Sequence, residues 1–310
     1  MKKRSFRHLA AQLALCVGAR LCLMLALAQS HGSNAAEIYL LVDVTPVMSA
    51  FKTQFGKVDS TTGVFTQIAA NVSNGLRIGN PTWNPTANAF YVTSEPSTSI
   101  TTLNMLDTSG TLSGSIGTLA ADMVFGMAYN TADSSLYAYS KRTVTWPTTV
   151  WNYSNIDPAT GASTVLTTPL ASLGTLQTGN FAIHQGTLYS SQTRVGGAGQ
   201  FGSFGFTAGS NYQQIGSNNS NFAYMSLASD GSTLFGVKKA GSSFKLFTIN
   251  PATGALDAGI DITGMSGGDI SLLGVGAISV PEPGTNMLAL IGAALLAAKA
   301  RLRRRRAQLA

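Results

Sequence analysis

A short turn motif recurs through the middle of this 310-residue chain at nearly constant spacing. In each clear copy an Asp or Asn follows a hydrophobic residue, and a Gly comes three or four residues later. Four clear copies and one degenerate copy lie at residues 58–63, 106–110, 156–161, 249–254 and, the degenerate one, 206–209. Their glycines are 47, 51, 48 and 45 residues apart in chain order. The chain therefore repeats one unit of supersecondary structure.

A second series with the same period lies between these turns. It consists of hydrophobic–aromatic pairs, each preceded by a polar turn: residues 90–91, 136–137, 188–189 and 234–235. Two interleaved series with one period indicate that each repeat contains several elements in fixed order. A period near 40–50 residues is typical of propellers and solenoids.

Each repeat is predicted to contain four short strands. In one copy they are residues 124–130, 136–140, 150–157 and 163–167, rich in Val, Thr, Tyr and Phe and separated by Gly, Pro, Asn and Asp. In the recurring turn the Asp or Asn side chain closes an Asx turn and the Gly supplies a positive φ. We therefore expect these aspartates to form turns and not to bind ligands.

The two ends of the repeat region complement each other. Residues 270–277 resemble a first strand with nothing after it, and residues 37–42 resemble a second strand with nothing before it. Together they predict an all-β, five-bladed β-propeller with about 49 residues in each four-stranded blade, closed by the N- and C-terminal strands. The pattern loosely resembles secreted bacterial propellers of the WD40-like or lactonase-like kind. A β-helix or β-sandwich is the alternative, although the two-series spacing argues against a sandwich.

The first 36 residues have the pattern of a secretory signal peptide. Lys2, Lys3, Arg4 and Arg7 precede a mostly apolar stretch at residues 9–27, and small-residue cleavage sites follow at 26–28 or 34–36. The expected partners are the Sec translocon and signal peptidase; an uncleaved N-terminal anchor is the alternative. The propeller domain is then predicted to span residues 37–280.

The last thirty residues combine three features in a fixed order. They are the Pro281, Glu282, Pro283 and Gly284 segment, an apolar run at residues 287–298, and a basic end made of Lys299, Arg301, Arg303, Arg304, Arg305 and Arg306. This order closely resembles the PEP-CTERM sorting signal of Gram-negative bacteria. The resemblance implies recognition by an exosortase, a membrane-embedded enzyme, with processing near the triplet and delivery to the cell surface or exopolysaccharide matrix.

The physical chemistry of this tail (residues 281–310) agrees with that reading. The prolines prevent a helix or central strand from running through the triplet. We expect a transmembrane helix over residues 284–300, which is short for a bilayer that needs roughly 20 residues but is extended by snorkelling basic side chains. The basic tail at 301–310 should remain cytoplasmic, which places the upstream chain outside. A membrane anchor that is never cut is the alternative.

Charge and cysteine content exclude several kinds of partner. Residues 37–298 contain nine basic and thirteen acidic side chains, a net charge of −4, so the basic total of +7 comes from the two termini. A basic face for nucleic acid is therefore not expected. Both cysteines, Cys16 and Cys22, precede residue 37, which excludes disulfides, a cysteine nucleophile and a thiolate zinc site from the exported region.

Few residues are candidates for catalysis. His184 is the one histidine after residue 36 and is predicted to lie in a turn, so we expect no multi-histidine metal site and no cofactor. A glycan-active enzyme, hydrolase or lyase, would need convergent carboxylates in the central funnel. Asp43, Asp122 and Asp269 are predicted near strand ends, and Glu95 in a loop after the strand that contains Tyr91. They make this enzyme the alternative hypothesis, with no assigned catalytic residue.

The preferred hypothesis is a non-catalytic protein of the surface or biofilm matrix. Trp83, Trp146 and Trp151 lie in or beside predicted blade loops and are candidate contacts for sugar rings, with blade packing as the alternative. Together with the sorting signal they suggest exopolysaccharide as a partner.

Overall fold

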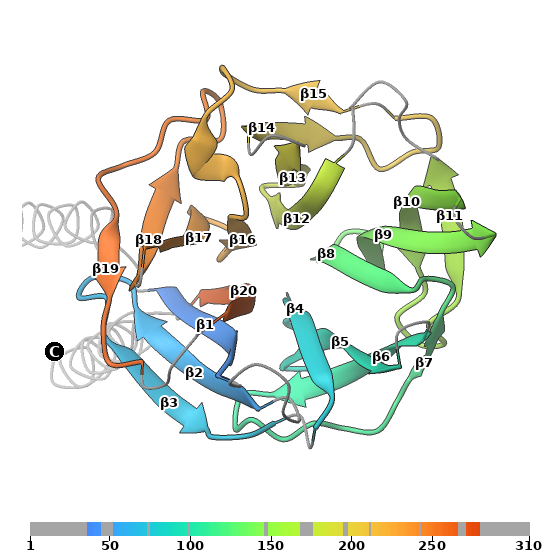
Figure 1. The fold of residues 1–310 in the computed structure, drawn as a ribbon, viewed down its shortest axis with the longest axis horizontal. Helices are drawn as coiled ribbons and strands as arrows, with labels where there is room; N and C mark the ends of the chain where they lie inside the picture. Colours follow the sequence, from blue (N-terminus) through green and yellow to red (C-terminus); the bar gives the residue numbers. More distant parts are fainter. Residues whose placement is uncertain are drawn as a thin grey trace, which may run out of the picture. The chain divides into compact units, whose positions relative to one another are not determined.

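The computed structural model describes residues 36–44, 52–72, 75–97, 100–145, 148–167, 176–194, 198–210, 212–241, 243–265 and 271–279. They belong to one compact unit, Ala36–Val280, and form five antiparallel four-stranded sheets arranged as a ring (Figure 1). The predicted five-bladed β-propeller is confirmed. Within these ranges the one helical element is a 3-10 turn, η2 (Ser220–Phe222). The expected signal peptide and the helix over residues 284–300 lie outside the described residues.

Four blades use consecutive strands, ordered outward from the centre. Blade 1 contains β4 (Arg77–Asn84), β5 (Ala89–Ser97), β6 (Ile100–Asp107) and β7 (Gly117–Leu119). Blade 2 contains β8 (Met123–Asn130), β9 (Ser135–Thr145), β10 (Thr148–Ile156) and β11 (Ser163–Thr167). Blade 3 contains β12 (Leu176–His184), β13 (Thr187–Arg194), β14 (Gly199–Phe204) and β15 (Gln213–Gln214), and blade 4 contains β16 (Ser226–Ser229), β17 (Leu234–Ala240), β18 (Ser243–Ile249) and β19 (Ile260–Ile262).

The fifth, closing blade joins the two ends of the described chain. Its innermost strand is β20 (Ser271–Ser279), followed outward by β1 (Ala36–Asp43), β2 (Thr53–Asp59) and β3 (Phe65–Ala69). Strands β20 and β1 pair antiparallel from the Ala36–Ser279 pair to the Asp43–Ser271 pair. The closure predicted from the unmatched end strands is therefore confirmed. It removes two free sheet edges that would otherwise favour aggregation.

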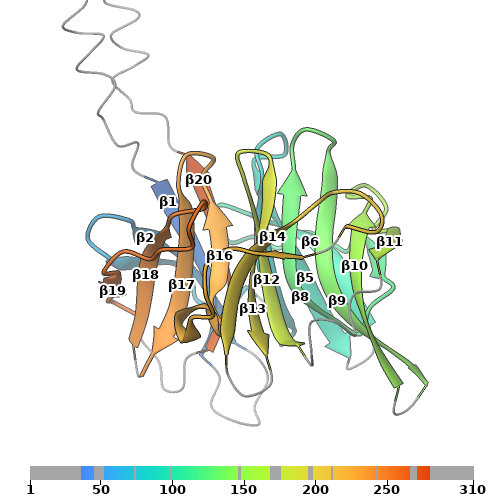
Figure 2. The same ribbon diagram turned by 90° about the horizontal axis from the view of Figure 1, so that it is seen from above.

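Hydrophobic side chains form five clusters, one between each pair of neighbouring blades. For example, Leu40 and Val237 belong to the cluster between the closing blade and blade 4, and Tyr153 and Phe181 to the cluster between blades 2 and 3. Both faces of each sheet are thus covered, which explains why the strands have few charged residues. Figure 2 shows the blades side by side, with their strands running between the two faces of the ring.

The recurring Asp or Asn closes the turn between the third and fourth strands of its blade. Asp59 Oδ1 accepts hydrogen bonds from the amides of Thr61 and Thr62, both at 2.8 Å. Asn250 Oδ1 accepts two amides in the same way, at 3.0 and 3.2 Å. The glycines that end these turns have φ between 70° and 86°. The Asx-turn prediction is confirmed, and it accounts for the aspartates without a ligand.

These turns also contact the outer strand of the preceding blade, or the residue beside it. A Cβ added to Gly63 of the closing blade would lie 2.3 Å from the carbonyl oxygen of Asp261 in β19. The amide of Gly209 in blade 3 donates to the carbonyl of Leu166 in β11, at 3.2 Å. The repeated motif is therefore both a hairpin turn and a contact between blades.

Candidate functional site

The inner strands of the five blades surround a cavity of about 430 Å³. It is lined by the second halves of β4, β8, β12, β16 and β20 and by the hairpin turns that follow the first four of them. Sites for small molecules have volumes of roughly 300–1,000 Å³. This central cavity is thus large enough for a small ligand, and its wall contains residues from all five blades.

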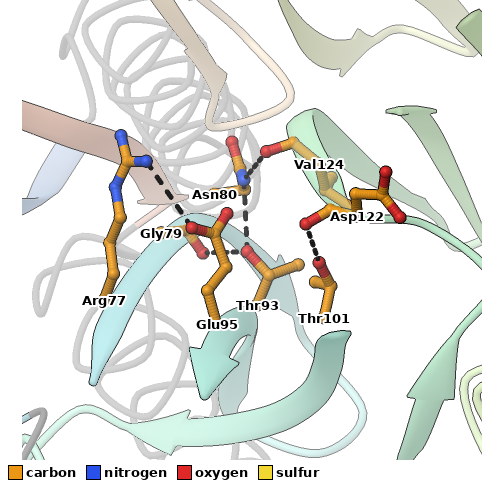
Figure 3. A network of polar contacts seen from close by, with 8 residues as sticks. All are labelled: Arg77, Gly79, Asn80, Thr93, Glu95, Thr101, Asp122 and Val124. Atoms are coloured by element: carbon orange, nitrogen blue, oxygen red, sulfur yellow. Dashed lines mark hydrogen bonds and ion pairs between the residues drawn. The ribbon is translucent and has the colours of Figure 1, made fainter. Parts of the chain in front are cut away.

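A bulge in β4 determines how this strand enters the cavity wall. Asn80 has a left-handed backbone, with φ of 54°, and the register of β4 against β5 shifts at this point. Its side-chain amide donates to the Val124 carbonyl at 2.8 Å and to Thr93 Oγ1 at 3.2 Å (Figure 3). Bulges redirect the residues that follow them. These bonds therefore position the next segment of β4, which carries Trp83 into the cavity wall.

The neighbouring strands β4 and β8 form an aromatic wall. Trp83 and Tyr129 both line the central cavity. The amide of Tyr129 donates to Thr82 Oγ1 at 3.0 Å, which ties the two strands together. Behind the wall, the Trp83 ring lies 5.0 Å from that of Phe90, and the Tyr129 ring lies 5.6 Å from that of Tyr91. Packing of this kind fixes the orientation of both rings.

The opposite wall contains the polar residues Ser229 and Asp230 beside the apolar Leu227 and Ala228. Around the ring β16 lies across from the β4 and β8 pair (Figure 1), and Ser229 and Asp230 at its end line the cavity. Asp230 Oδ1 accepts the amides of Ser232 at 2.8 Å and Thr233 at 2.6 Å, so the turn fixes this carboxylate. Among the described residues that line the cavity, Asp230 is the one charged side chain.

His184 is the last residue of β12 and not a turn residue as the sequence predicted. It is buried, with 4% of its surface exposed, and its Nδ1 lies 3.0 Å from Ser229 Oγ of the next blade. Burial lowers the pKa of His184, while the charge of Asp230 acts in the opposite direction. Asn84 and Asn130 hold the same position at the ends of β4 and β8. The imidazole therefore serves as a neutral contact between blades.

Of the carboxylates proposed for a glycan-active enzyme, the described ones, Asp43, Asp122 and Glu95, do not line the central cavity. Asp43 is the last residue of β1 and pairs with the first residue of the inner strand β20. Asp122 immediately precedes the inner strand β8. Both therefore lie at the start of an inner strand, whereas the cavity is lined by the second halves of these strands. Glu95 belongs to β5 and not to a loop. Its pKa is raised by burial, an effect that Arg77 at 3.5 Å partly offsets (Figure 3). Asp269 lies outside the described residues.

The three tryptophans have different surroundings. Trp83 lines the central cavity and also packs against the cluster between the closing blade and blade 1. Trp151 packs against the cluster between blades 2 and 3, with ring centroids 5.1 Å from Phe125 and 5.5 Å from Tyr139. Trp146 lies outside the described residues, as do the sorting residues at 281–284 and the basic tail. Tyr129 and Asp230 were not predicted as site residues. Tyr129 precedes Asn130 as Trp83 precedes Asn84, so the repeat register contained a signal for it.

Two further features, a candidate metal site and a membrane-spanning helix, do not occur in the described part of the chain. It contains no group of three or more His, Cys, Asp or Glu side chains placed to hold a metal ion. None of its helices has the length and apolar character needed to cross a membrane.

Comparison with known proteins identifies the C-terminal segment. Residues 279–306 match the family model of the PEP-CTERM protein-sorting motif. The chain is therefore an exported protein with a β-propeller body and a sorting motif that implies processing by an exosortase. The sequence matches no curated protein.

Several solved structures resemble the propeller at low sequence identity. TolB from Acinetobacter baumannii is 16% identical, with 71% of this chain and 52% of that one covered and a TM-score of 0.47. A chain of a nidogen/laminin complex is 9% identical, with 79% of this chain and 98% of that one covered and a TM-score of 0.46. A periplasmic gluconolactonase, PpgL, from Pseudomonas aeruginosa is 13% identical, with 74% of this chain and 82% of that one covered and a TM-score of 0.37. The chain thus spans about half of the TolB chain that it matches. Likeness at this level says nothing of activity.

Proposed function

We propose that this protein is a component of the cell surface or extracellular matrix whose propeller binds exopolysaccharide in the central cavity without cleaving it. The observation that carries the proposal is the cavity itself, whose lining includes Trp83 and Tyr129 on one side and Ser229 and Asp230 on the other. A sugar ring has apolar C–H faces and a polar edge of hydroxyl groups. An aromatic surface opposite hydrogen-bonding groups matches both.

The sorting motif supports this location. In the proposed sequence of events, the helix over residues 284–300 holds the chain in the inner membrane with its basic tail in the cytoplasm. Exosortase then processes the chain near residues 281–284, and the propeller reaches the surface or the matrix. The body is rich in Ser, Thr, Asn and Gly, which suits a hydrated extracellular setting.

A non-catalytic role is favoured over the alternative of a glycan-active enzyme. Glycoside hydrolysis in its usual form requires two carboxylates on opposite sides of the scissile bond. The described residues that line the cavity supply one, Asp230, and its Oδ1 is already held by the amides of its own turn. The enzyme alternative predicts new reducing ends when the protein is incubated with the polysaccharide, whereas our proposal predicts none.

Calorimetry with the host's own exopolysaccharide tests binding. We expect Trp83→Ala to weaken binding about tenfold to hundredfold, because the loss of an aromatic anchor costs about 1–3 kcal/mol. Trp151→Ala is the matched control: it removes the same kind of side chain from the cluster between blades 2 and 3, away from the cavity lining, and should leave affinity unchanged in folded protein. Flat titrations with the unmodified protein, or equal losses in both variants, would contradict binding in the cavity.

Terminal-peptide mass spectrometry on the protein isolated from the matrix fraction tests the sorting step. A C-terminus within residues 281–284 is expected. An intact arginine block at 303–306, found in the inner-membrane fraction, would instead indicate a retained anchor.

A further inference from the structure

The charge of the central cavity restricts the sugars that it can accept. Its described lining contains one carboxylate, Asp230, and no Lys, Arg or His. A fixed negative charge in a confined site disfavours an anionic guest and favours a cationic one. Acidic sugars such as uronates are therefore poor candidates for this cavity.

The turn holds the Asp230 carboxylate through only one of its two oxygens. The amides of Ser232 and Thr233 and the Ser232 hydroxyl all donate to Oδ1, at 2.6–2.9 Å. Within the described chain these bonds fix the side chain through one oxygen. Oδ2 is then free to accept a hydrogen bond from a ligand in the cavity.

The aromatic wall favours the same kind of ligand. Trp83 and Tyr129 lie across the ring from β16 and from the turn that contains Asp230. Aromatic faces attract cations through their quadrupole, and the attraction is stronger where water is displaced. A guest in the cavity lies between one wall that includes this carboxylate and another that includes the two aromatic residues.

We infer that the central cavity selects a sugar residue that carries a free, protonated amine. The inference rests on the proposed function and specifies its ligand: an amino sugar has an apolar ring face for the aromatic wall and an ammonium group for Asp230. N-acetylation removes the charge from the same sugar, and a uronate reverses it.

The test compares three oligosaccharides of equal length in calorimetry at low salt: a glucosamine tetramer, its fully N-acetylated form and a galacturonate tetramer. The protein is used in its mature form, as isolated from its host. We expect the glucosamine tetramer to bind about tenfold more tightly than the acetylated one, as for an ion pair in a partly enclosed site, and the uronate to bind least.

Two variants assign the effect to Asp230. Asp230→Asn removes the charge but keeps a carbonyl oxygen for the turn amides, as Asn84 does for the Thr86 amide in blade 1. It should reduce the preference for the amine to less than about threefold. Asp133→Asn is the matched control: Asp133 lies in the corresponding turn of blade 2, where its Oδ1 accepts the Ser135 amide, and is absent from the cavity wall.

The outcomes separate this inference from the proposed function. Equal affinity for the charged and acetylated tetramers, tighter binding of the uronate, or the same loss in both variants would overturn the amine preference. So would the failure of all three probes to bind. Binding of the host polysaccharide that depends on Trp83 would still support the proposed function in each of these cases.

Discussion

At the scale of single residues, the turn aspartates couple the stability of the fold to pH. The amides of Thr62 and Thr61 lower the pKa of Asp59, and the amide of Ala159 with the hydroxyl of Thr160 lowers that of Asp157. Because each folded-state pKa lies below the unfolded value of about 3.9, ionisation favours the fold above that pH. This contribution is lost as the pH falls through the folded-state pKa. We predict that the urea midpoint decreases below about pH 4.

A double variant isolates this effect. Asp59→Asn with Asp157→Asn keeps an acceptor in each turn, as Asn250 does in blade 4, but removes the titrating group. Its urea midpoint should vary less between pH 6 and about pH 3 than that of the unmodified protein. An unchanged slope would mean that other carboxylates dominate. The turns were predictable from sequence because their hydrogen bonds join residues two to four positions apart.

At the scale of elements, the third-to-fourth-strand turns connect neighbouring blades. Gly63 and Gly209 have nearly equal φ, 73° and 77°, but an added Cβ meets the Asp261 carbonyl oxygen at Gly63 and nothing within 4 Å at Gly209. Alanine at either site costs about 1–2 kcal/mol for its left-handed backbone. We predict that Gly63→Ala costs about 1–3 kcal/mol more than Gly209→Ala, because it must displace β19.

Denaturant unfolding of the two variants measures this difference directly. Equal losses of unfolding free energy in the two variants would show that Gly63 matters only for its left-handed backbone and not for its contact with the neighbouring blade. The sequence predicted the strands and turns of blade 2 closely, since alternation and turn chemistry are local. It could not predict which glycine touches the neighbouring blade, because that depends on how two sheets twist against each other.

At the scale of the whole molecule, ring closure creates both the stability and the candidate site. The period and the unmatched end strands predicted the closed ring. The cavity wall was harder to foresee, because Trp83, Tyr129 and Asp230 are separated in sequence and meet only when five inner strands surround one axis. Trp83, like Trp146 and Trp151, was chosen for its residue type and its place in or beside a predicted blade loop, neither of which identifies a cavity wall. Asp43 and Asp122 were assigned to the funnel although they lie where inner strands begin.

The pairing of β1 with β20 is the seam at which the ring closes, so a covalent bond across it should stabilise the entire propeller. Glu37 and Ile278 are paired residues on these strands. Antiparallel partners have Cα atoms about 4.5–5.5 Å apart, within the range of about 4.4–6.8 Å that a disulfide requires. Glu37→Cys with Ile278→Cys would close a long loop, and residues 37–298 contain no cysteine to compete. We expect a gain of about 2–4 kcal/mol, or about 5–15 °C in melting temperature.

The reduced form of the same variant is the control, because it has lost the 2.8 Å ion pair between Glu37 and Lys57 but has no cross-link. That pair is partly exposed and worth less than about 1 kcal/mol. Ile278 also packs against the cluster between the closing blade and blade 1, so the reduced form should melt somewhat below the unmodified protein, and the gain from the bond is the difference between the oxidised and reduced forms. If the oxidised and reduced forms melt together although mass spectrometry confirms the bond, unfolding does not require the seam to open. The blades would then separate first at one of the five hydrophobic clusters between them, and ring closure would protect the edges of β1 and β20 without limiting global stability.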